Sequence, residues 1–218
     1  MDYVALRLSL LLALLTVAAL LPLALIIGHW LATTRWRGRH LAEAALTLPL
    51  VLPPTVIGFY LLAAINPASP AGALWEALFG RQLAFSFSAI LIASIFVNLP
   101  FAIQPAQRAF EAVPADLRDA AATCGMAPFT AFVRITLPLA WPGILTGAIL
   151  AFAHTLGEFG VVLMVGGAIP GETRTLSLAI YDRVQAFDMA AAGQMSAVLL
   201  AISLAAVAAS FLLSARRR

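Results

Sequence analysis

The sequence contains no lysine, one cysteine and few charged residues of any kind. Charged side chains make up 11% of the 218 residues and hydrophobic ones 62%, whereas about 25% are charged in a typical soluble domain. The lone Cys124 excludes an internal disulfide and a metal site with several thiolate ligands. Long uncharged runs of Leu, Ala, Val, Ile and Phe take the place of charge, and they indicate an integral membrane protein in a lipid bilayer.

The sequence also lacks any segment that could fold as a soluble catalytic domain. No hydrophilic stretch between the apolar runs is long enough for one, and there is no Gly-rich phosphate loop followed by a lysine. ATP hydrolysis and high-affinity ligand capture are therefore expected in other chains. We predict that this chain is not an enzyme and carries no cofactor of its own.

Five apolar segments are predicted to cross the membrane as helices, since about 20 residues span the hydrocarbon layer. They cover roughly residues 8–31, 41–65, 85–107, 135–165 and 190–213. The first is too long for the apolar core of a cleavable signal peptide, so we expect a span there. The fourth is too long for one straight span, and we expect tilt or a break near Gly157 and Gly160. Residues 1–218 are thus predicted to form one all-α transmembrane domain.

The uneven distribution of arginine predicts the orientation. One cluster, Arg35, Arg37 and Arg39, lies between the first two spans, and residues 216–218 form another. Such clusters mark the cytoplasmic side, which makes nucleic-acid binding the weaker interpretation of the net charge of +3. Five spans then leave the N-terminus outside and the C-terminus in the cytoplasm. The polar segment 111–134, between the third and fourth spans, becomes cytoplasmic.

This polar segment, with the sequence DLRDAAATCGMAPFTAFVRITLP from Asp116 to Pro138, predicts two short helices around a glycine corner. Pro114 suits the first position of a helix, and Asp116 favours the positive end of the helix dipole. Gly125 suits a left-handed cap, after which Pro128 can begin a second helix. The apolar face contains Ala120 and Ala121, which would let a partner protein approach closely. The alternative is a helix lying on lipid headgroups, which usually needs bulky apolar residues and a basic polar face.

The same segment resembles a known sequence motif, the EAA loop of bacterial ABC-importer permeases. The matching positions are Asp119, Ala120, Ala121, Gly125, Ile135, Leu137 and Pro138. In that family the loop is a coupling helix that sits in a cleft of a cytoplasmic ATPase. The resemblance implies the same role here, with Asp116, Met126 and Pro128 in the docking segment. Asp119 stands where the family has glutamate, so a contact made by that carboxylate must form at closer range.

Longer stretches are similar to the permeases of molybdate importers. They are residues 46–62, 134–152 and 156–181, and the related sulfate permeases share much of the pattern. The resemblance implies a subunit in the bacterial inner membrane that imports molybdate or tungstate, or alternatively sulfate or thiosulfate. It also implies an extracytoplasmic oxyanion-binding protein and an ATPase dimer that binds ATP and magnesium. Since five helices do not easily enclose a pathway, we expect a homodimer with the passage on its twofold axis.

Glu158 lies inside the fourth predicted span, where an ionisable residue is costly and often functional. His154 lies four residues earlier on the same helical face. An intramembrane enzyme or metal pair is one interpretation, but two ligands without an HExxH motif make a poor metal site, so we predict none. The others are a structural carboxylate at a helix break and a gate residue.

The gate interpretation extends to several residues of the second, third and fourth spans. Prolines and polar side chains free backbone groups, which is tolerated at membrane depth beside protein or a water-filled cavity. Similarity to the family's Gly-Glu-Phe-Gly segment adds four positions. The predicted gate and pathway residues are Pro53, Pro54, Asn98, Gly157, Glu158, Phe159 and Gly160. Gly143 and Gly147 are expected to pack closely against another helix, in the same subunit or in a second copy.

Overall fold

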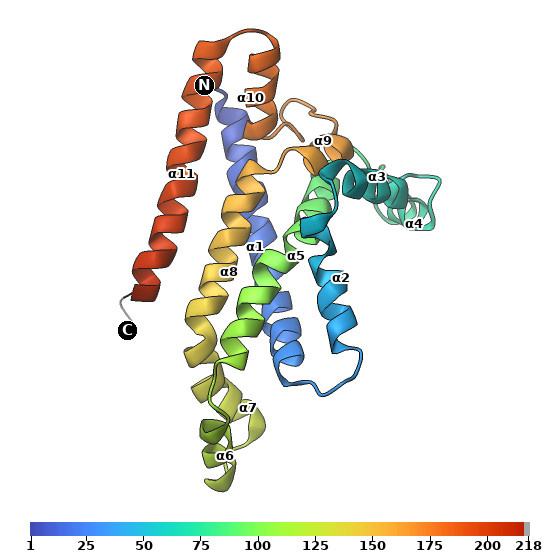
Figure 1. Ribbon diagram of the computed structural model, residues 1–218. Coiled ribbons are helices and arrows are strands. Elements are labelled where there is room, and N and C mark those ends of the chain that lie inside the picture. The colour runs from blue at the N-terminus through green and yellow to red at the C-terminus, as the bar shows by residue number, and fades with distance from the viewer. Residues whose placement is uncertain (216–218) are drawn as a thin grey trace.

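The computed structural model describes residues 1–215 and consists, over that range, of helices joined by short connections (Figure 1). The long helices α1 (Tyr3–Thr33), α5 (Phe87–Glu111) and α8 (Leu137–Gly157) pack together at the centre. Helix α11 (Met189–Ala215) runs beside α8. Within the described residues, four helices are long and apolar enough to cross a membrane, or five if a bent pair counts as one span. The all-helical prediction is therefore confirmed for the described residues.

Small residues let the central helices approach one another closely. A Cβ atom at Gly28 of α1 would lie 3.1 Å from the Cβ atom of Ala106 on α5. At Gly143 of α8 it would lie 2.5 Å from the Cβ atom of Ala109. Close backbone approach of this kind is a main source of helix association in lipid. The Gly143–Gly147 pair thus packs against α5 of its own chain.

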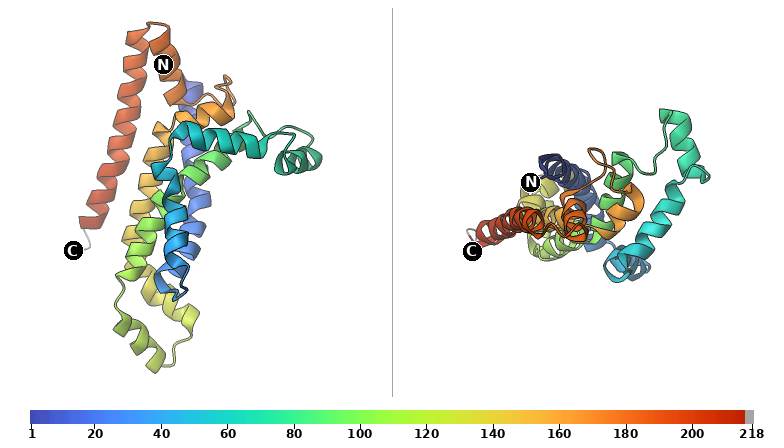
Figure 2. Two further views of the ribbon diagram at one scale, coloured as in Figure 1. Left: turned by 45° about the vertical axis from the view of Figure 1, so that its right-hand side comes forward. Right: turned by 90° about the horizontal axis from the view of Figure 1, so that it is seen from above.

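The second predicted span, 41–65, is not one straight helix. It consists of α2 (Arg39–Val51) and α3 (Pro54–Ile65), which meet at an angle of 109°. The cause is the Pro53–Pro54 pair, because proline has no N–H to donate and forces the preceding residue into an extended conformation, as seen at Leu52 (ψ 140°). Helices α3 and α4 (Pro70–Phe79) therefore project sideways from the bundle (Figure 2).

The fourth predicted span, 135–165, is also divided. Its first helix starts earlier than predicted, at α7 (Pro128–Ala131), and continues through a π-helical turn at Phe132–Thr136 into α8. The chain then leaves the helix at Glu158 and Phe159 and re-enters one at α9 (Gly160–Gly166). The expected break near Gly157 and Gly160 is confirmed.

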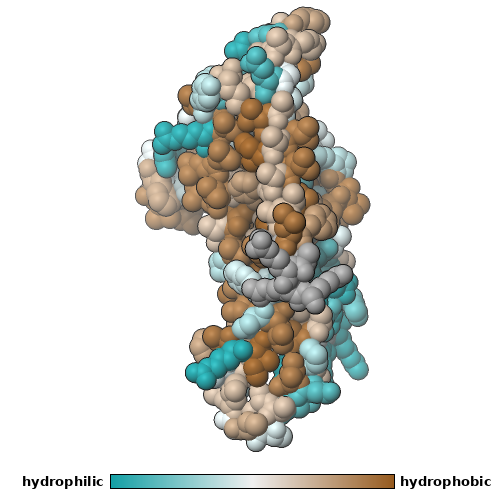
Figure 3. All heavy atoms as spheres, turned by 90° about the vertical axis from the view of Figure 1, so that its left-hand side faces the viewer, coloured by the Kyte–Doolittle hydropathy of each residue, from teal (hydrophilic) through white to brown (hydrophobic). Residues whose placement is uncertain are grey.

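Polar elements gather at the two ends of the bundle. One end carries the α1–α2 connection, α6 (Ala115–Thr123) and α7, whereas the other carries the N-terminus and α10 (Leu176–Gln185) (Figure 1). Between them, one face of the molecule is mostly apolar (Figure 3). Exposed leucines of α11, such as Leu200 and Leu204, belong to that apolar exterior. The arginines at 216–218, used above for orientation, lie outside the described residues.

Candidate functional site

The predicted coupling loop has the expected shape, two short helices around a glycine corner. Helix α6 ends at Thr123, and Gly125 follows with φ +73°. The N–H of Met126 donates to the carbonyl oxygen of Ala121 at 3.0 Å, and that of Gly125 to Ala122 at 3.0 Å. These are the bonds of a glycine-capped helix end, in which a left-handed residue satisfies the last carbonyls. Pro114 differs from the prediction, because it precedes the first helical residue instead of being it.

The outward surface of this loop combines acidic and small residues with large apolar ones, among them Leu117 at 42% and Phe129 at 77% exposed. Asp116, Asp119, Ala120 and Pro128 are exposed, whereas Ala121 is only 5% exposed and contacts its own chain. A partner protein would therefore meet Ala120 and not Ala121. Of the remaining predicted residues, Met126, Ile135 and Leu137 are half-buried and Pro138 is exposed.

The loop is braced against the end of α1. The ring of His29 lies edge-on to Phe110 of α5, at 5.2 Å between centroids, and to Phe132 at 4.9 Å. A pocket of about 320 Å³ opens between α1 and the loop, with Arg118 and Met126 on its loop side. The aromatic contacts tie the start of the fourth span to α1 and α5, so the loop does not hang freely from the bundle.

At the opposite half of the bundle, Glu158 organises the break between α8 and α9. Its side chain is 8% exposed, and its Oε1 accepts a hydrogen bond from the backbone N–H of Val161 at 3.0 Å. The hydroxyl of Ser177 on α10 donates to the backbone oxygen of Glu158 at 2.8 Å. The carboxylate thus caps the first turn of α9, where free N–H groups favour a negative charge.

His154 links Glu158 to Asn98 on α5. Because the amide nitrogen of Asn98 donates to the carbonyl oxygen of Ser94 at 2.8 Å, its Oδ1 is the atom facing His154 Nδ1, at 3.1 Å. His154 Nε2 then faces Glu158 Oε2 at 3.9 Å. No three His, Cys, Asp or Glu side chains of residues 1–215 come together as a metal site. His154 and Glu158 therefore belong to a polar chain that joins α5, α8 and α9.

The two broken spans meet at their breaks. A Cβ atom at Gly160 would lie 2.7 Å from the Cβ atom of Pro54, and one at Gly58 would lie 2.7 Å from that of Met164. Helices α3 and α9 consequently pack side by side at the same level of the bundle. Phe159 is half-buried near Tyr181, at 4.9 Å between ring centroids. Of the predicted gate residues, Pro54, Glu158, Phe159 and Gly160 come together at these breaks, while Asn98 reaches them through His154.

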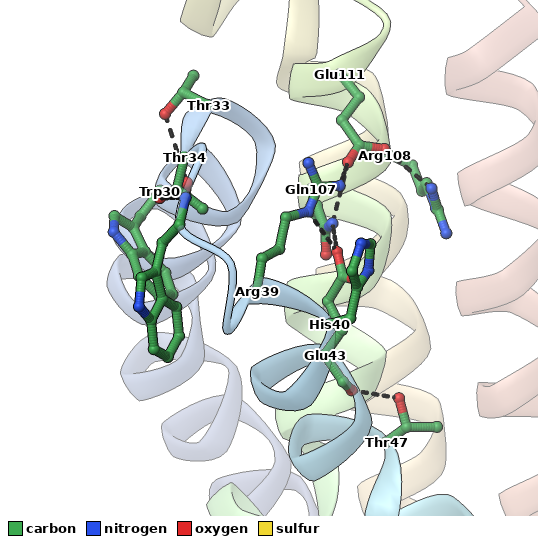
Figure 4. A network of polar contacts seen from close by, with 11 residues as sticks. Trp30, Thr33, Thr34, Arg39, His40, Glu43, Thr47, Gln107, Arg108 and Glu111 are labelled. Carbon is green, nitrogen blue, oxygen red and sulfur yellow. Dashed lines mark hydrogen bonds and ion pairs between the residues drawn. The ribbon is translucent and has the colours of Figure 1, made fainter.

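A polar network between α2 and α5 was missed by the sequence analysis (Figure 4). Arg39, Glu43 and Thr47 of α2 contact Gln104, Gln107 and Glu111 of α5. The sequence signal was the four-residue spacing of polar side chains at the start of the second span. Nothing in the sequence alone says which helix faces it, so Arg39 was used only as a marker of orientation.

Comparisons with known proteins identify the class. Residues 8–218 match the family described as "Binding-protein-dependent transport system inner membrane component". The chain belongs to this family of ABC-importer permeases. It is thus of a class of transport subunits and not of enzymes, and the interpretation of His154 and Glu158 as an enzyme site is withdrawn.

Its curated relatives are permeases named for molybdenum transport. It is 48% identical over 191 residues to the molybdenum transport system permease protein ModB of Azotobacter vinelandii, covering 88% of this chain and 84% of that one. Identity with ModB of Escherichia coli K12 is 37% over 184 residues, covering 84% and 80%. A probable sulfate transport permease of Chlorella vulgaris is 34% identical over 176 residues, covering 80% of this chain and 66% of that one.

Solved structures show the same fold in more distant transporters. A bacterial ABC transporter that imports the acidic polysaccharide alginate matches with a TM-score of 0.79 at 16% identity, over 98% of this chain and 79% of the other. An amino acid ABC transporter matches with a TM-score of 0.66 at 18% identity, over 97% and 92%. At such identities the likeness concerns the fold alone.

Proposed function

We propose that this chain is the membrane-spanning subunit of an ATP-driven importer that brings molybdate or tungstate into the bacterial cytoplasm. The observation that carries the proposal is the 48% identity, over most of both chains, with a permease named for molybdenum transport. Further relatives with the same name, at 37–41% identity, support the same substrate class.

In this proposal the α6–α7 loop docks an ATPase dimer, which binds ATP and magnesium. Its support is the exposed, acidic surface with a small residue, Ala120, beside the glycine corner. The loop end of the bundle then faces the cytoplasm, which agrees with Arg35 and Arg37 in the α1–α2 connection at the same end. The N-terminus lies outside, and the C-terminus faces the cytoplasm.

A second copy of the chain completes the transporter. Within residues 1–215, three long helices pack at the centre of the subunit, and small residues let them approach too closely for an open channel between them. Since one subunit encloses no passage between these helices, we place the passage between two copies, on their twofold axis. An extracytoplasmic oxyanion-binding protein delivers the anion to the α10 end; a related fold is known in complex with a periplasmic protein that carries an alginate pentasaccharide.

The gate in this proposal lies where the two broken spans meet. Half-helices α3 and α9 are short and are tied together at Pro54 and Gly160, and in this proposal both breaks lie at membrane depth. Backbone that leaves a helix at such depth is tolerated beside protein or a water-filled passage. Glu158 holds one side of this break and does not bind the anion, because an ionised carboxylate would repel it.

Deletion of the gene in its host tests the substrate class. We expect the deletion strain to lose cellular molybdenum when molybdate is scarce and to regain it when molybdate is abundant. Sulfur assimilation should be unaffected. A strain that keeps its molybdenum and requires reduced sulfur would instead support the sulfate alternative, which the Chlorella vulgaris relative favours.

A further inference from the structure

Helix α2 is attached to α5 by a row of polar side chains (Figure 4). Along α2 these side chains follow at four-residue spacing, so they share one face of the helix. Each contacts a residue on the facing side of α5. We call the set the α2–α5 polar ladder: Arg39, Glu43 and Thr47 of α2, with Gln104, Gln107 and Glu111 of α5.

Each rung of the ladder crosses between the helices. Arg39 pairs with the carboxylate of Glu111, and its Nε donates to Glu43 Oε1 at 2.9 Å. Gln107 Nε2 donates to Glu43 Oε1 at 2.6 Å and to Glu111 Oε1 at 3.0 Å. Gln104 Nε2 donates to Thr47 Oγ1 at 3.0 Å. The first two rungs are therefore coupled, because Glu43 and Glu111 share both Arg39 and Gln107.

Helix α2 has few apolar contacts beside the ladder, since only Ala42 and Leu46 of its apolar side chains, besides Pro49, pack against the core. Pro49 is its one buried residue, while Leu41, Leu48 and Val51 are 77%, 52% and 75% exposed. Because most of its large apolar side chains point away from the bundle, the polar contacts contribute much of what holds this helix in position. Since these contacts are directional, they fix the register of α2 on α5 as well as its distance.

The ladder lies between the two elements that the transport cycle would move. At one end, Glu111 is the last residue of α5, and three residues separate it from α6 in the coupling loop. At the other end, α2 stops at the Pro53 break, where the chain bends by 109° into α3. Helix α2 thus has a bend at one end and, at the other, a polar attachment to the part of α5 from which the coupling loop starts.

We propose that the α2–α5 polar ladder transmits movement of the coupling loop to α2, with Arg39 and Glu111 as its positioning residues. The inference rests on the proposed function, since it takes α6 as the element that the ATPase moves. When α6 moves, Glu111 and the end of α5 move with it, and the intact ladder carries α2 about the Pro53 break. That motion changes the position of α3 beside α9, and so reaches the gate.

The test compares arginine variants in the complete transporter, reconstituted with its ATPase and binding protein. Arg39→Gln should lower anion uptake per ATP hydrolysed by about tenfold, the size of a typical coupling between sites, while ATP hydrolysis continues. Arg39→Lys keeps the charge and should restore most of the ratio. Arg37→Gln removes the same charge from an exposed residue of the adjoining α1–α2 connection and is the matched control. An unchanged ratio in Arg39→Gln would overturn the inference.

A cross-link keeps the proposal testable if Arg39→Gln does not assemble. In a Cys124→Ser background, Thr47→Cys and Gln104→Cys are bridged by a short, reducible thiol reagent. Because the ladder stays closed as it moves, bridging should leave uptake by the otherwise unchanged transporter intact, and it should restore coupling in Arg39→Gln until the bridge is reduced. Uptake that stops on bridging would mean that the ladder must open, and would overturn the inference. Failure of the unbridged wild type to import any oxyanion would count against the proposed function instead.

Discussion

Glu158 and Val161 are joined by a hydrogen bond that spans the break in the fourth membrane segment. The Glu158 carboxylate accepts the N–H of Val161 at 3.0 Å, and Ser177 of α10 donates to the backbone oxygen of the same residue at 2.8 Å. One residue thus fixes where α9 begins and how α10 sits above it. The acidic side chain inside the fourth predicted span therefore has a structural role, which is to cap α9.

Two substitutions of Glu158 should separate the effect of its hydrogen bond to Val161 from the effect of its charge. Glu158→Gln keeps an oxygen that can accept the Val161 N–H, whereas Glu158→Ala leaves that N–H without its partner. Loss of a helix cap costs about 0.5–2 kcal/mol, so the alanine variant should melt at a lower temperature than the glutamine variant in thermal unfolding of the detergent-purified protein. Equal melting temperatures for the two variants would refute the capping role.

The contact between the two breaks predicts that an added methyl group is harmful at Gly160 and harmless at Gly157. In Gly160→Ala the new methyl group would lie 2.7 Å from the Cβ atom of Pro54, so α3 and α9 must move apart. Overpacking of this kind costs about 1–3 kcal/mol. Gly157→Ala is the matched control, because nothing lies within 4 Å of its added Cβ atom. Gly160→Ala should lower both the melting temperature and the uptake rate, whereas Gly157→Ala should change neither. Equal melting temperatures and uptake rates for the two variants would contradict the packing.

The two alanines of the coupling loop should also differ. Ala120→Leu adds a bulky side chain at an exposed position, so the subunit should stay folded and lose affinity for its ATPase in co-purification. Ala121 is buried in its own chain, and Ala121→Leu should lower the melting temperature instead. Normal ATPase binding by a folded Ala120→Leu variant would count against the docking surface.

Gly125→Ala tests the corner between α6 and α7. With φ +73° at this position, a side chain costs about 1–2 kcal/mol through backbone strain, although nothing lies within 4 Å of the added Cβ atom. We expect the helical core to unfold at nearly the wild-type temperature while ATPase association weakens. Full association would show that the glycine corner is not needed for docking.

The N-terminus predicts an acid-dependent loss of stability. A hydrogen bond from the backbone N–H of Ala5 lowers the pKa of Asp2 from its ordinary value, and the nearby guanidinium of Arg174, which donates to Asp2 Oδ2 at 2.7 Å, lowers it further. A carboxylate with a lowered pKa stabilises the fold above its unfolded pKa, about 3.9, and this stabilisation is lost as pH falls through the folded value.

The melting temperature of the wild type should therefore fall more steeply below pH 4 than that of Asp2→Asn, and the variant should be the less stable one at neutral pH. Asp182→Asn is the control, because Asp182 lies 3.8 Å from the same arginine and is half exposed. Parallel pH curves for wild type and Asp2→Asn would exclude a contribution from the Asp2–Arg174 pair.

Local sequence signals predicted the elements that depend on neighbours along the chain. The corner at Gly125 was predicted as the structure has it, because caps and turns are set by a few adjacent residues. Hydropathy likewise found the apolar segments. Hydropathy alone does not show that the fourth segment is two helices, because a carboxylate cap at Glu158 can end a helix without any loss of apolar character in the residues that follow.

Relationships between distant segments could not be predicted in the same way. The Pro53–Pro54 pair indicates a break, but the direction of α3 is set by its contact with α9 at Gly160, about 100 residues further along. The burial of Ala121 and the partners of Arg39 likewise depend on which helix lies opposite. Periodicity gives the face of a helix and not its neighbour.

Uptake by the reconstituted transporter tests the proposed function most directly. Proteoliposomes holding this chain with its ATPase are supplied with ATP inside, the binding protein outside, and radiolabelled molybdate or sulfate. We predict ATP-dependent accumulation of molybdate that a large excess of sulfate does not displace. Accumulation of sulfate without molybdate, or no ATP-dependent uptake of either anion by an assembled and ATP-hydrolysing complex, would contradict it.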